Sequence, residues 1–484
     1  MPCYFYFSRM KQTYHVPNWE LWLRKKWRNI EQHPFSQGII RRIPPELRNR
    51  IPFQSIPLWI ASILTGLVAV GYEHAFELFE GLAKEIYRLN PYWLFLTAPI
   101  FFTLSRWLVT TFAPHAKGSG IPQLMAAVES ADTQKKRWVD SLLNLPVLLT
   151  KLASSLVLLL GGGAIGREGP TLQIAGSIFQ LTYRFIPTHW HRVSQKIMLI
   201  TGGASGLAAA FNTPLGGIVY VVEELTKSHI GQFRTAVFSA VIIAGMTAQL
   251  FLGSYLYLGF PRIKPLPLEM IGWVILIASI GGLLGAYFTR LILAFQRWLS
   301  PFFLSYKQWI TTFILGLLFA TLVNFVGEQS MGTGKSLINT ILFQPETETK
   351  WYLFPARFTA SILSFLTGGA GGIFATSLSS GAALGDVLNT IFQIAPEHHN
   401  LMVLLAMIGF LTGVTRTPFT SAILVLEMTD RHSAIFYFLL AGMLANVAAS
   451  FVLKRSFYEI QKDLLFSQFR LDEKKLETKN QQEE

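Results

Sequence analysis

A series of long apolar runs fills most of this chain between Ile51 and Leu453, and no other feature constrains its fold as strongly. A run of about 18–20 apolar residues is long enough to cross the hydrocarbon core of a bilayer. Only 14% of the 484 residues are Asp, Glu, Lys or Arg, whereas soluble domains average about 25%. We therefore predict an all-α integral membrane protein. The candidate spans are Tyr92–Phe112, Leu142–Gly163, Ala236–Leu252, Met270–Phe295, Ile310–Val326 and Phe436–Leu453, with Leu58–Val70 as a shorter one.

Positive charge is concentrated ahead of the first run. The net charge is +13, and the first 50 residues hold ten Lys or Arg. Because basic flanks tend to remain in the cytoplasm, we predict that residues 1–50 form a cytoplasmic segment on the anionic inner leaflet. Nothing else in the chain supports nucleic-acid binding. The lone Cys3 gives neither a disulfide nor a metal framework.

Glycine-rich breaks interrupt the apolar runs and occur in pairs whose members lie 204 to 214 residues apart. Three pairs in the same order indicate a duplication, although glycine-rich membrane helices can also resemble one another by chance. Paired broken helices favour a transporter built from two repeats. The pairs are Gly118-Ser119-Gly120 with Gly332-Thr333-Gly334, Gly163–Glu168 with Gly369–Phe374, and Thr213-Pro214-Leu215 with Thr417-Pro418-Phe419.

We divide the chain accordingly. The membrane domain is expected over residues 51–465, with repeat halves at about 57–228 and 270–430. A polar C-terminal tail, residues 466–484, would follow it, and it is too short to form a further soluble domain.

The stretch Gly166–Pro170 carries the most specific chemistry. Its glycines and proline suit the start of a helix, where free N–H groups and the helix dipole form an anion site. Glu168 places a carboxylate at the same position. An ionisable residue within a membrane segment is costly and is by default functional. The alternative is a buried ion pair between Glu168 and Arg167.

Two further glycine-rich turns are weaker signals. In Gly118–Pro122, the Ser119 hydroxyl can donate to a dehydrated halide without adding a full charge, but a simple helix cap would explain it equally well. In Gly371–Thr376, backbone amides can complete an anion cradle, or the small residues can simply allow close helix packing.

Two acidic residues and one misleading motif complete the survey. Glu223 and Glu224 end a helical run, so one can face a polar interior while the other meets solvent or a basic group; a solvated helix end is the alternative. Gly332–Ser336 resembles a phosphate-binding loop, but Gln329 stands where that motif requires glycine. We therefore predict no nucleotide and no enzymatic activity.

These motifs, taken together and in this order, resemble those of the CLC family of chloride channels and transporters. The family's GSGIP and GREGP stretches are similar to Gly118–Pro122 and Gly166–Pro170, its GxFxP is similar to Gly372–Thr376, and Gly206–Pro214 is also alike. The resemblance covers roughly residues 57–465. It implies the CLC-type fold, with two repeated halves that we expect to be inverted.

The resemblance also implies site roles and partners. The protein would be a homodimer with one anion pathway per subunit, lying among membrane lipids, with chloride as the bound and transported ion and no cofactor, metal or nucleotide. Thr376 departs from the family's proline, but threonine can still start a helix. The implied roles are chloride binding by the hydroxyls of Ser119 and Tyr458 and the amides of Ile373 and Phe374, gating by Glu168, and inner proton relay by Glu224.

The implied function is exchange of chloride for protons. Glu224 favours exchange, because channels of the family usually carry an apolar residue there, and Ser119 favours chloride over other anions. A passive chloride channel and a non-transporting membrane scaffold are the alternatives. The short tail implies that the family's regulatory nucleotide-binding domains are absent. We expect a multi-pass protein of a prokaryotic inner or plasma membrane, with both termini in the cytoplasm.

Overall fold

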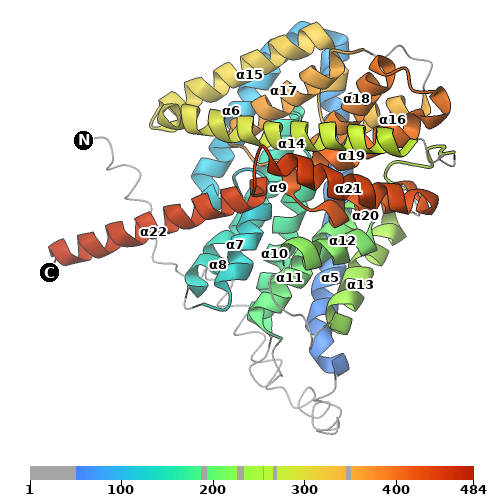
Figure 1. Cartoon of the computed structure of the whole chain (residues 1–484). Helices are drawn as coiled ribbons and strands as arrows, with labels where there is room; N and C mark the ends of the chain where they lie inside the picture. The colour runs from blue at the N-terminus through green and yellow to red at the C-terminus, as the bar shows by residue number, and fades with distance from the viewer. Residues whose placement is uncertain are drawn as a thin grey trace.

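The computed structural model describes residues 51–133, 135–186, 193–225, 234–253, 256–264, 270–344 and 350–483 (Figure 1). The predicted basic segment, residues 1–50, lies outside this set. The described residues are almost entirely helical, as the apolar runs predict. The helices are α5 (Ile51–Leu89), α6 (Leu94–Phe112), α7 (Ile121–Ser130), α8 (Lys136–Leu142), α9 (Leu145–Leu160), α10 (Glu168–Phe185), α11 (Gln195–Phe211), α12 (Pro214–Tyr220), α13 (Arg234–Leu252), α14 (Ile271–Leu299), α15 (Lys307–Val326), α16 (Lys335–Phe343), α17 (Leu353–Leu366), α18 (Phe374–Ile391), α19 (His399–Thr415), α20 (Pro418–Thr429), α21 (Ile435–Ser450) and α22 (Phe457–Glu483).

Within the described ranges, eight helical segments are long and apolar enough to cross a membrane. They include all six long runs predicted from the sequence, and the shorter run Leu58–Val70 proves to be part of a span at Ser55–Leu89. The eighth span, Pro396–Thr415, is absent from the sequence prediction. Its apolar stretch is short, and it reaches spanning length only through the polar residues that precede Leu401. It lies in the centre of the protein, with 89% of its window buried.

Several helices are too short to span, and they begin at glycine or proline. α7, α12 and α20 each carry a proline in the first turn, where the missing N–H has no helical partner to lose. Around them, α14, α19 and α21 pack against one another across the middle of the molecule (Figure 1). The short helices can therefore end inside the protein, where neighbouring groups satisfy their backbone.

The two halves meet through reciprocal contacts. The carboxylate of Glu223, at the end of α12, accepts hydrogen bonds from the amides of Phe419 and Thr420 at the start of α20. Its counterpart Glu427, in α20, accepts from the amides of Leu215 and Gly216 at the start of α12. The two helices therefore lie antiparallel, each capped by the other. A two-fold axis between inverted halves produces this pattern, because each residue meets its counterpart's neighbours.

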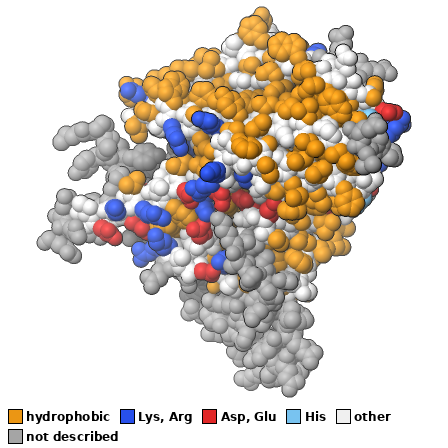
Figure 2. Space-filling view, viewed as in Figure 1, with side chains coloured by type: hydrophobic (Ala, Val, Ile, Leu, Met, Phe, Trp, Pro, Cys, Tyr) orange, Lys and Arg blue, Asp and Glu red, His pale blue; other side chains and the backbone are white. Residues whose placement is uncertain are grey.

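The outer surface separates apolar and charged regions. Figure 2 shows hydrophobic side chains over most of the upper part of this face, while charged side chains gather along α22 and below it. α22 begins inside the body of the protein and then projects from it (Figure 1). It is one helix, and it crosses the boundary that we expected at residue 465.

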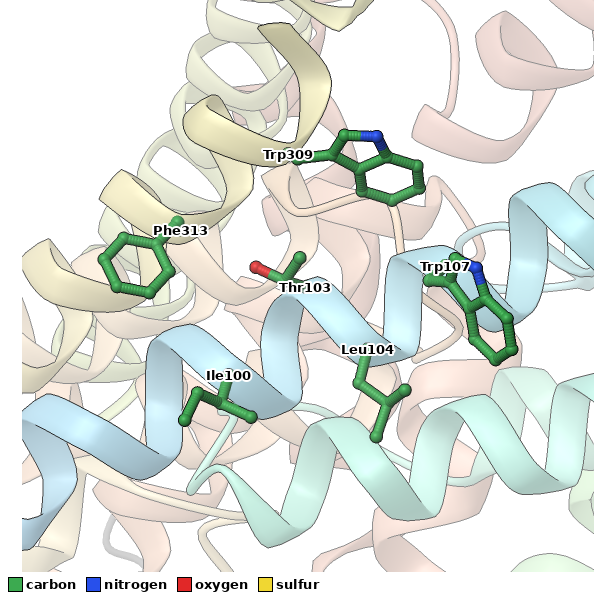
Figure 3. A pocket seen from close by; sticks show the side chains of 6 residues that line it. All are labelled: Ile100, Thr103, Leu104, Trp107, Trp309 and Phe313. Atoms are coloured by element: carbon green, nitrogen blue, oxygen red, sulfur yellow. The ribbon is translucent and has the colours of Figure 1, made fainter. Parts of the chain in front are cut away.

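A shallow hollow on the apolar surface lies between α6 and α15 (Figure 3). Its lining is almost entirely hydrophobic, so its place is among lipid-facing side chains, and it contains none of the predicted site residues. The residues that line it are Ile100, Thr103, Leu104, Trp107, Trp309 and Phe313.

Candidate anion-binding site

The glycine-rich breaks singled out in the sequence meet at one place inside the protein. The amide of Gly118 donates to the carbonyl of Gly369 at 2.9 Å, and the amide of Gly371 donates to the carbonyl of Gly118 at 3.0 Å. Gly166 and Gly372 exchange two backbone hydrogen bonds of 2.8 and 2.9 Å. These bonds hold together the breaks that precede α7, α10 and α18. Because a helix start is electropositive and carries free N–H groups, their convergence suits a monovalent anion.

Ser119 lies at the start of α7 with its hydroxyl unused. The residue is 3% exposed, and its Oγ has no hydrogen-bond partner in the part of the chain that the structure describes. A Cβ atom at Gly169 would lie 2.3 Å from this oxygen, so only glycine there lets the hydroxyl approach the start of α10. The alternative interpretation of Ser119 as a helix cap is therefore wrong, because Gly120 occupies the cap and no side-chain capping bond is made.

Glu168 is the first residue of α10 and is fully buried. Neither carboxylate oxygen has a hydrogen-bond partner that satisfies the usual geometry among the described residues. Arg167 forms an ion pair with Glu73 instead, at 2.6 Å, so the alternative of an Arg167–Glu168 pair is wrong. The carboxylate of Glu168 lies near the amide of Ala375, in the first turn of α18. It therefore occupies the region where the helix starts meet.

The third break supplies amides and close packing together. α18 begins at Phe374, and its first helical bond runs from the amide of Ser377 to the carbonyl of Ile373. The amides of Ile373 and Phe374 precede that bond and so lie in the turn that has no helical acceptors. Thr376, in place of the family's proline, donates its hydroxyl to Ile373 at 3.1 Å, and the helix starts as expected. Close packing is also present, because a Cβ at Gly372 would lie 3.1 Å from the carbonyl oxygen of Gly166.

Tyr458 reaches the same place from the far end of the chain. It lies in the first turn of α22 and is fully buried. Its hydroxyl lies within hydrogen-bonding reach of that of Ser119, although neither oxygen makes a hydrogen bond of the usual geometry among the described residues. Two neighbouring buried hydroxyl groups that are not fully satisfied can both donate to water or to an anion.

Glu223 and Glu224 separate as the sequence suggests, but with different partners. A π-helical turn, Val221–Leu225, carries both acids beyond α12. Glu223 accepts from the amide and hydroxyl of Thr420 at 2.7 and 2.8 Å, so its partly exposed carboxylate also caps the start of α20. Glu224 is half-buried and lies within electrostatic reach of Tyr458. It therefore approaches the candidate anion site from the C-terminal end of α12.

With the fold and this geometry established, comparison with known proteins places the chain. The family described as "Voltage gated chloride channel" matches residues 101–450, which is most of the chain. The chain belongs to this family. A curated relative, the H(+)/Cl(-) exchange transporter ClcA of Citrobacter koseri, is 29% identical over 419 residues, covering 81% of this chain and 84% of that protein.

Solved structures agree with the voltage-gated chloride channel family fold. A slow cyanobacterial Cl⁻/H⁺ antiporter superposes with a TM-score of 0.73 at 24% identity, covering 86% of this chain and 98% of that chain. A CLC-type fluoride/proton antiporter gives a TM-score of 0.70 at 19% identity, with the same coverage of 86% and 98%. At these identities the likeness establishes the fold alone.

Lys151 of this family member is absent from the sequence prediction. It lies in α9, is fully buried, and donates from Nζ to the carbonyl of Gly118 at 2.8 Å. A buried ammonium group needs strong compensation, and a single carbonyl supplies only part of it. An anion beside Ser119 would supply more. The signal was visible in the sequence, because Lys151 is the only charged residue within the apolar run Leu145–Leu160.

Proposed function

We propose that this protein is a secondary active transporter that exchanges chloride for protons across a membrane. One observation carries the proposal: the carboxylate of Glu168 is fully buried beside the amide of Ala375, where the starts of α10 and α18 meet. An ionised carboxylate and a chloride ion carry the same charge and suit the same donors. The curated relative named as an H(+)/Cl(-) exchange transporter supports this reading.

Chloride binding follows from the groups that face the site. Dehydrated chloride is held by the hydroxyls of Ser119 and Tyr458 and by the amides of Ile373 and Phe374, all of them neutral donors. Several weak donors allow an ion to enter and also to leave, whereas a full positive charge in direct contact would retain it. Lys151 acts from behind Gly118, where it raises the local potential without touching the ion.

Proton coupling follows from competition at Glu168. When ionised, Glu168 fills the anion position and closes the outer path. When it takes up a proton, it loses its charge and its attraction to the helix starts, so it leaves the position and chloride enters. Glu224 delivers protons from the inner side, because it lies within electrostatic reach of Tyr458 at the site. Chloride and protons therefore move in opposite directions through one shared carboxylate.

Paired flux measurements in liposomes test this mechanism. Wild-type protein is expected to move protons uphill when a chloride gradient is imposed. Glu168→Gln is expected to keep chloride flux and abolish proton pumping, because a neutral amide neither competes as an anion nor releases a proton. Glu224→Ala should also uncouple, whereas Glu328→Gln, at an exposed ion pair remote from the site, serves as a matched control that remains coupled. Persistent proton pumping in Glu168→Gln would refute the mechanism, and a wild-type reversal potential that ignores pH would establish a passive channel.

We also propose that the protein functions as a homodimer that covers α12 and α20. Leu215, Val222 and Phe419 are 53%, 58% and 49% exposed, and they surround the carboxylate caps of two short helices. In lipid, such broken helices need protein cover. The mass of the detergent-solubilised protein, corrected for bound detergent, is expected to be that of two chains. Leu215→Glu with Phe419→Glu should give monomers, and a wild-type monomer would contradict the proposal.

The orientation is proposed from the charge distribution: both termini face the cytoplasm of a prokaryotic cell. The ten basic residues among the first 50 support this assignment. Cys3 is the single cysteine of the sequence, so it is a ready-made label. A membrane-impermeant maleimide should label it in inside-out vesicles and not in intact cells. Labelling of intact cells would reverse the assignment.

A further inference from the structure

Tyr220 is a buried tyrosine whose hydroxyl the proposed mechanism does not use. It is 1% exposed, and its hydroxyl has no hydrogen-bond partner in the described part of the chain. Leaving a buried hydroxyl unsatisfied costs about 1–3 kcal/mol, so such a group in a folded protein usually meets water or a ligand. A phenylalanine in its place would fill nearly the same space without that cost.

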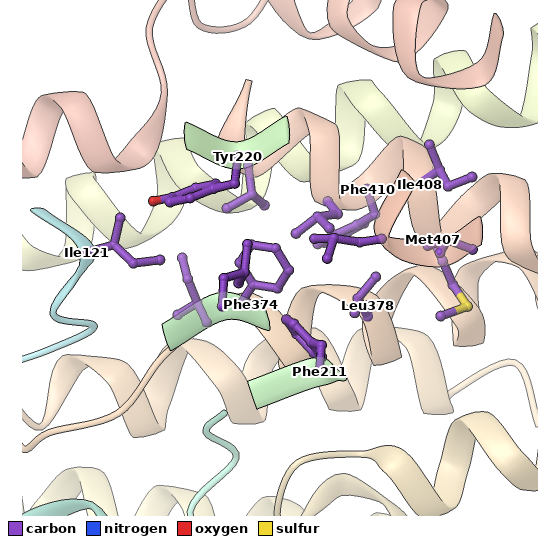
Figure 4. Packing of buried hydrophobic residues seen from close by; sticks show 14 of the residues in the cluster. Ile121, Phe211, Tyr220, Phe374, Leu378, Met407, Ile408 and Phe410 are labelled. Atoms are coloured by element: carbon purple, nitrogen blue, oxygen red, sulfur yellow. The ribbon is translucent and has the colours of Figure 1, made fainter. Parts of the chain in front are cut away.

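The position of Tyr220 directs this hydroxyl to the anion site. It is the last residue of α12, directly before the π-helical turn that carries Glu224. Figure 4 shows Tyr220 in the same buried cluster as Phe374, with its oxygen directed toward Ile121, the first residue of α7. All three belong to the same buried cluster as Tyr458. The hydroxyl therefore approaches the two helix starts to which we assign chloride binding.

The surroundings of Tyr220 indicate what its hydroxyl can bind. Tyr458 and Glu224 lie within electrostatic reach of it. The hydroxyl of Tyr458 in turn lies within hydrogen-bonding reach of that of Ser119, just ahead of α7. Among the described residues, none of the three hydroxyl oxygens makes a hydrogen bond of the usual geometry. Neighbouring hydroxyls from three parts of the chain suit a single monovalent anion, which can accept from all of them.

We propose that Tyr220 is a third hydroxyl ligand of the transported halide, on the inner side of the position bounded by Ser119 and Tyr458. This inference rests on the proposed anion site and adds a residue to it. The end of α12 would then have two roles. Tyr220 would donate a hydrogen bond to the anion, and Glu224, four residues later, would be the inner carboxylate. The anion and the proton thus approach each other closely on the inner side.

Calorimetric titration of chloride into purified protein tests the assignment, with Tyr220→Phe as the variant. Removal of the hydroxyl alone is expected to raise the dissociation constant about three- to tenfold. Tyr257→Phe is the matched control: Tyr257 is also buried and packs on Phe211, but its hydroxyl is near Arg357, so chloride affinity should be unchanged. Thermal melting in detergent should show that both variants are folded.

A double variant sharpens the test. If Tyr220 and Tyr458 bind the same ion, the combined loss in Tyr220→Phe with Tyr458→Phe should differ from the product of the separate losses. Unchanged chloride affinity in folded Tyr220→Phe would overturn the assignment, and so would reduced proton flux with normal affinity, which would make the residue part of the proton route. Because binding is measured without transport, a wild-type protein that binds chloride but fails to exchange it would refute the proposed function and leave this inference standing.

Discussion

Gly118-Ser119-Gly120 and Gly332-Thr333-Gly334 are counterparts in the two halves, and their backbones are built alike. In each turn both glycines have positive φ, from 62° to 100°, a region that residues with a Cβ rarely adopt. The second glycine caps a short helix, α7 in the first half and α16 in the second. The duplication seen in the sequence therefore extends to backbone conformation.

A buried basic side chain donates to the first glycine carbonyl of each turn. In the first half, Lys151 of α9 donates to the carbonyl of Gly118. In the second half, Arg357 of α17 donates to the carbonyls of Ser330, Met331 and Gly332. Both cations are fully buried. The guanidinium satisfies three carbonyls where the ammonium satisfies one, so the second turn is held more firmly.

The turns differ in what fills the space in front of them. The hydroxyl of Ser119 has no partner among the described residues, whereas the hydroxyl and amide of Thr333 both donate to the carboxylate of Glu80, at 3.0 and 3.3 Å. Glu80 comes from α5 and also pairs with Lys84. The second turn thus holds an anionic group of the protein itself. A glycine turn of this kind can bind an external anion, or it can be a purely structural contact when a carboxylate from another helix accepts its hydrogen bonds.

The largest expected effect is a loss of stability, and it should differ between the two buried basic residues, Arg357 and Lys151. Arg357→Met leaves three carbonyls unsatisfied and should destabilise the protein by roughly 3–5 kcal/mol, seen as loss of monodisperse protein or a steep fall in melting temperature. Lys151→Met removes one bond and should cost less stability, but it should weaken chloride binding because it borders the open turn. Equal stability loss in both variants, with no change in chloride affinity for Lys151→Met, would contradict the distinction.

The two hydroxyls should respond oppositely. Ser119→Ala is expected to weaken chloride binding about tenfold, since a hydrogen bond to an ion contributes roughly 1.5 kcal/mol, with little change in melting temperature. Thr333→Val should leave chloride affinity intact and lower stability by about 1 kcal/mol, because the carboxylate of Glu80 loses a donor. Calorimetry and thermal melting of both variants check this. A fall in chloride affinity for Thr333→Val would mean that the second turn is also a site.

Glu223 and Glu427, which cap α20 and α12, occupy equivalent positions in the two halves, so their contributions to stability can be compared. Glu223→Ala and Glu427→Ala should each lower stability by about 1–2 kcal/mol. Glu223→Ala should lower stability slightly more than Glu427→Ala, because Glu223 accepts three hydrogen bonds and Glu427 accepts two. Thermal melting should be compared with Glu77→Ala, where the nearest basic group, that of Lys335, is 3.9 Å away and the acid is mostly exposed. If only one of the two caps affected stability, the symmetry would not extend to their energetics.

The smallest expected effect concerns pH at the second turn. Arg88 donates two hydrogen bonds to Glu328, just ahead of this turn, and they lower the pKa of that carboxyl below its usual range. Its stabilising contribution is therefore complete above about pH 4.3 and disappears as the pH falls through the lowered pKa. The partly exposed pair should contribute only about 0.2–1 kcal/mol.

Melting temperatures of wild type and Glu328→Gln measure this contribution directly. The two proteins should differ slightly at neutral pH and converge in acid, where the wild-type carboxyl is also neutral. A difference that stays constant with pH would show that the ion pair does not anchor the turn.

The membrane class, the internal duplication and the helix starts could all be predicted from the amino-acid sequence. Long apolar runs leave few other folds, and glycine or proline at a helix start acts locally, so the starts of α7, α10 and α18 could be predicted without tertiary information. The span at Pro396–Thr415 was missed because its apolar stretch is short, and its burial against α14 and α18 depends on neighbours that a single sequence does not specify.

Which polar groups find hydrogen-bond partners depends instead on how the helices pack in three dimensions. Two glycine turns of nearly the same sequence differ in their hydrogen bonding. The carboxylate of Glu80, which is remote in sequence, accepts a hydrogen bond from Thr333 of the second turn, whereas Ser119 of the first turn has no such carboxylate partner among the described residues. Likewise Arg167 bonds Glu73 and not its neighbour Glu168, and Tyr220, which we propose as a halide ligand, is directed toward Ile121 from the end of α12 (Figure 4). Such outcomes depend on contacts between residues remote in sequence, whereas helix starts depend on adjacent residues. This is the physical reason that the glycine breaks could be predicted to precede helices, whereas the side-chain contacts around them could not be predicted.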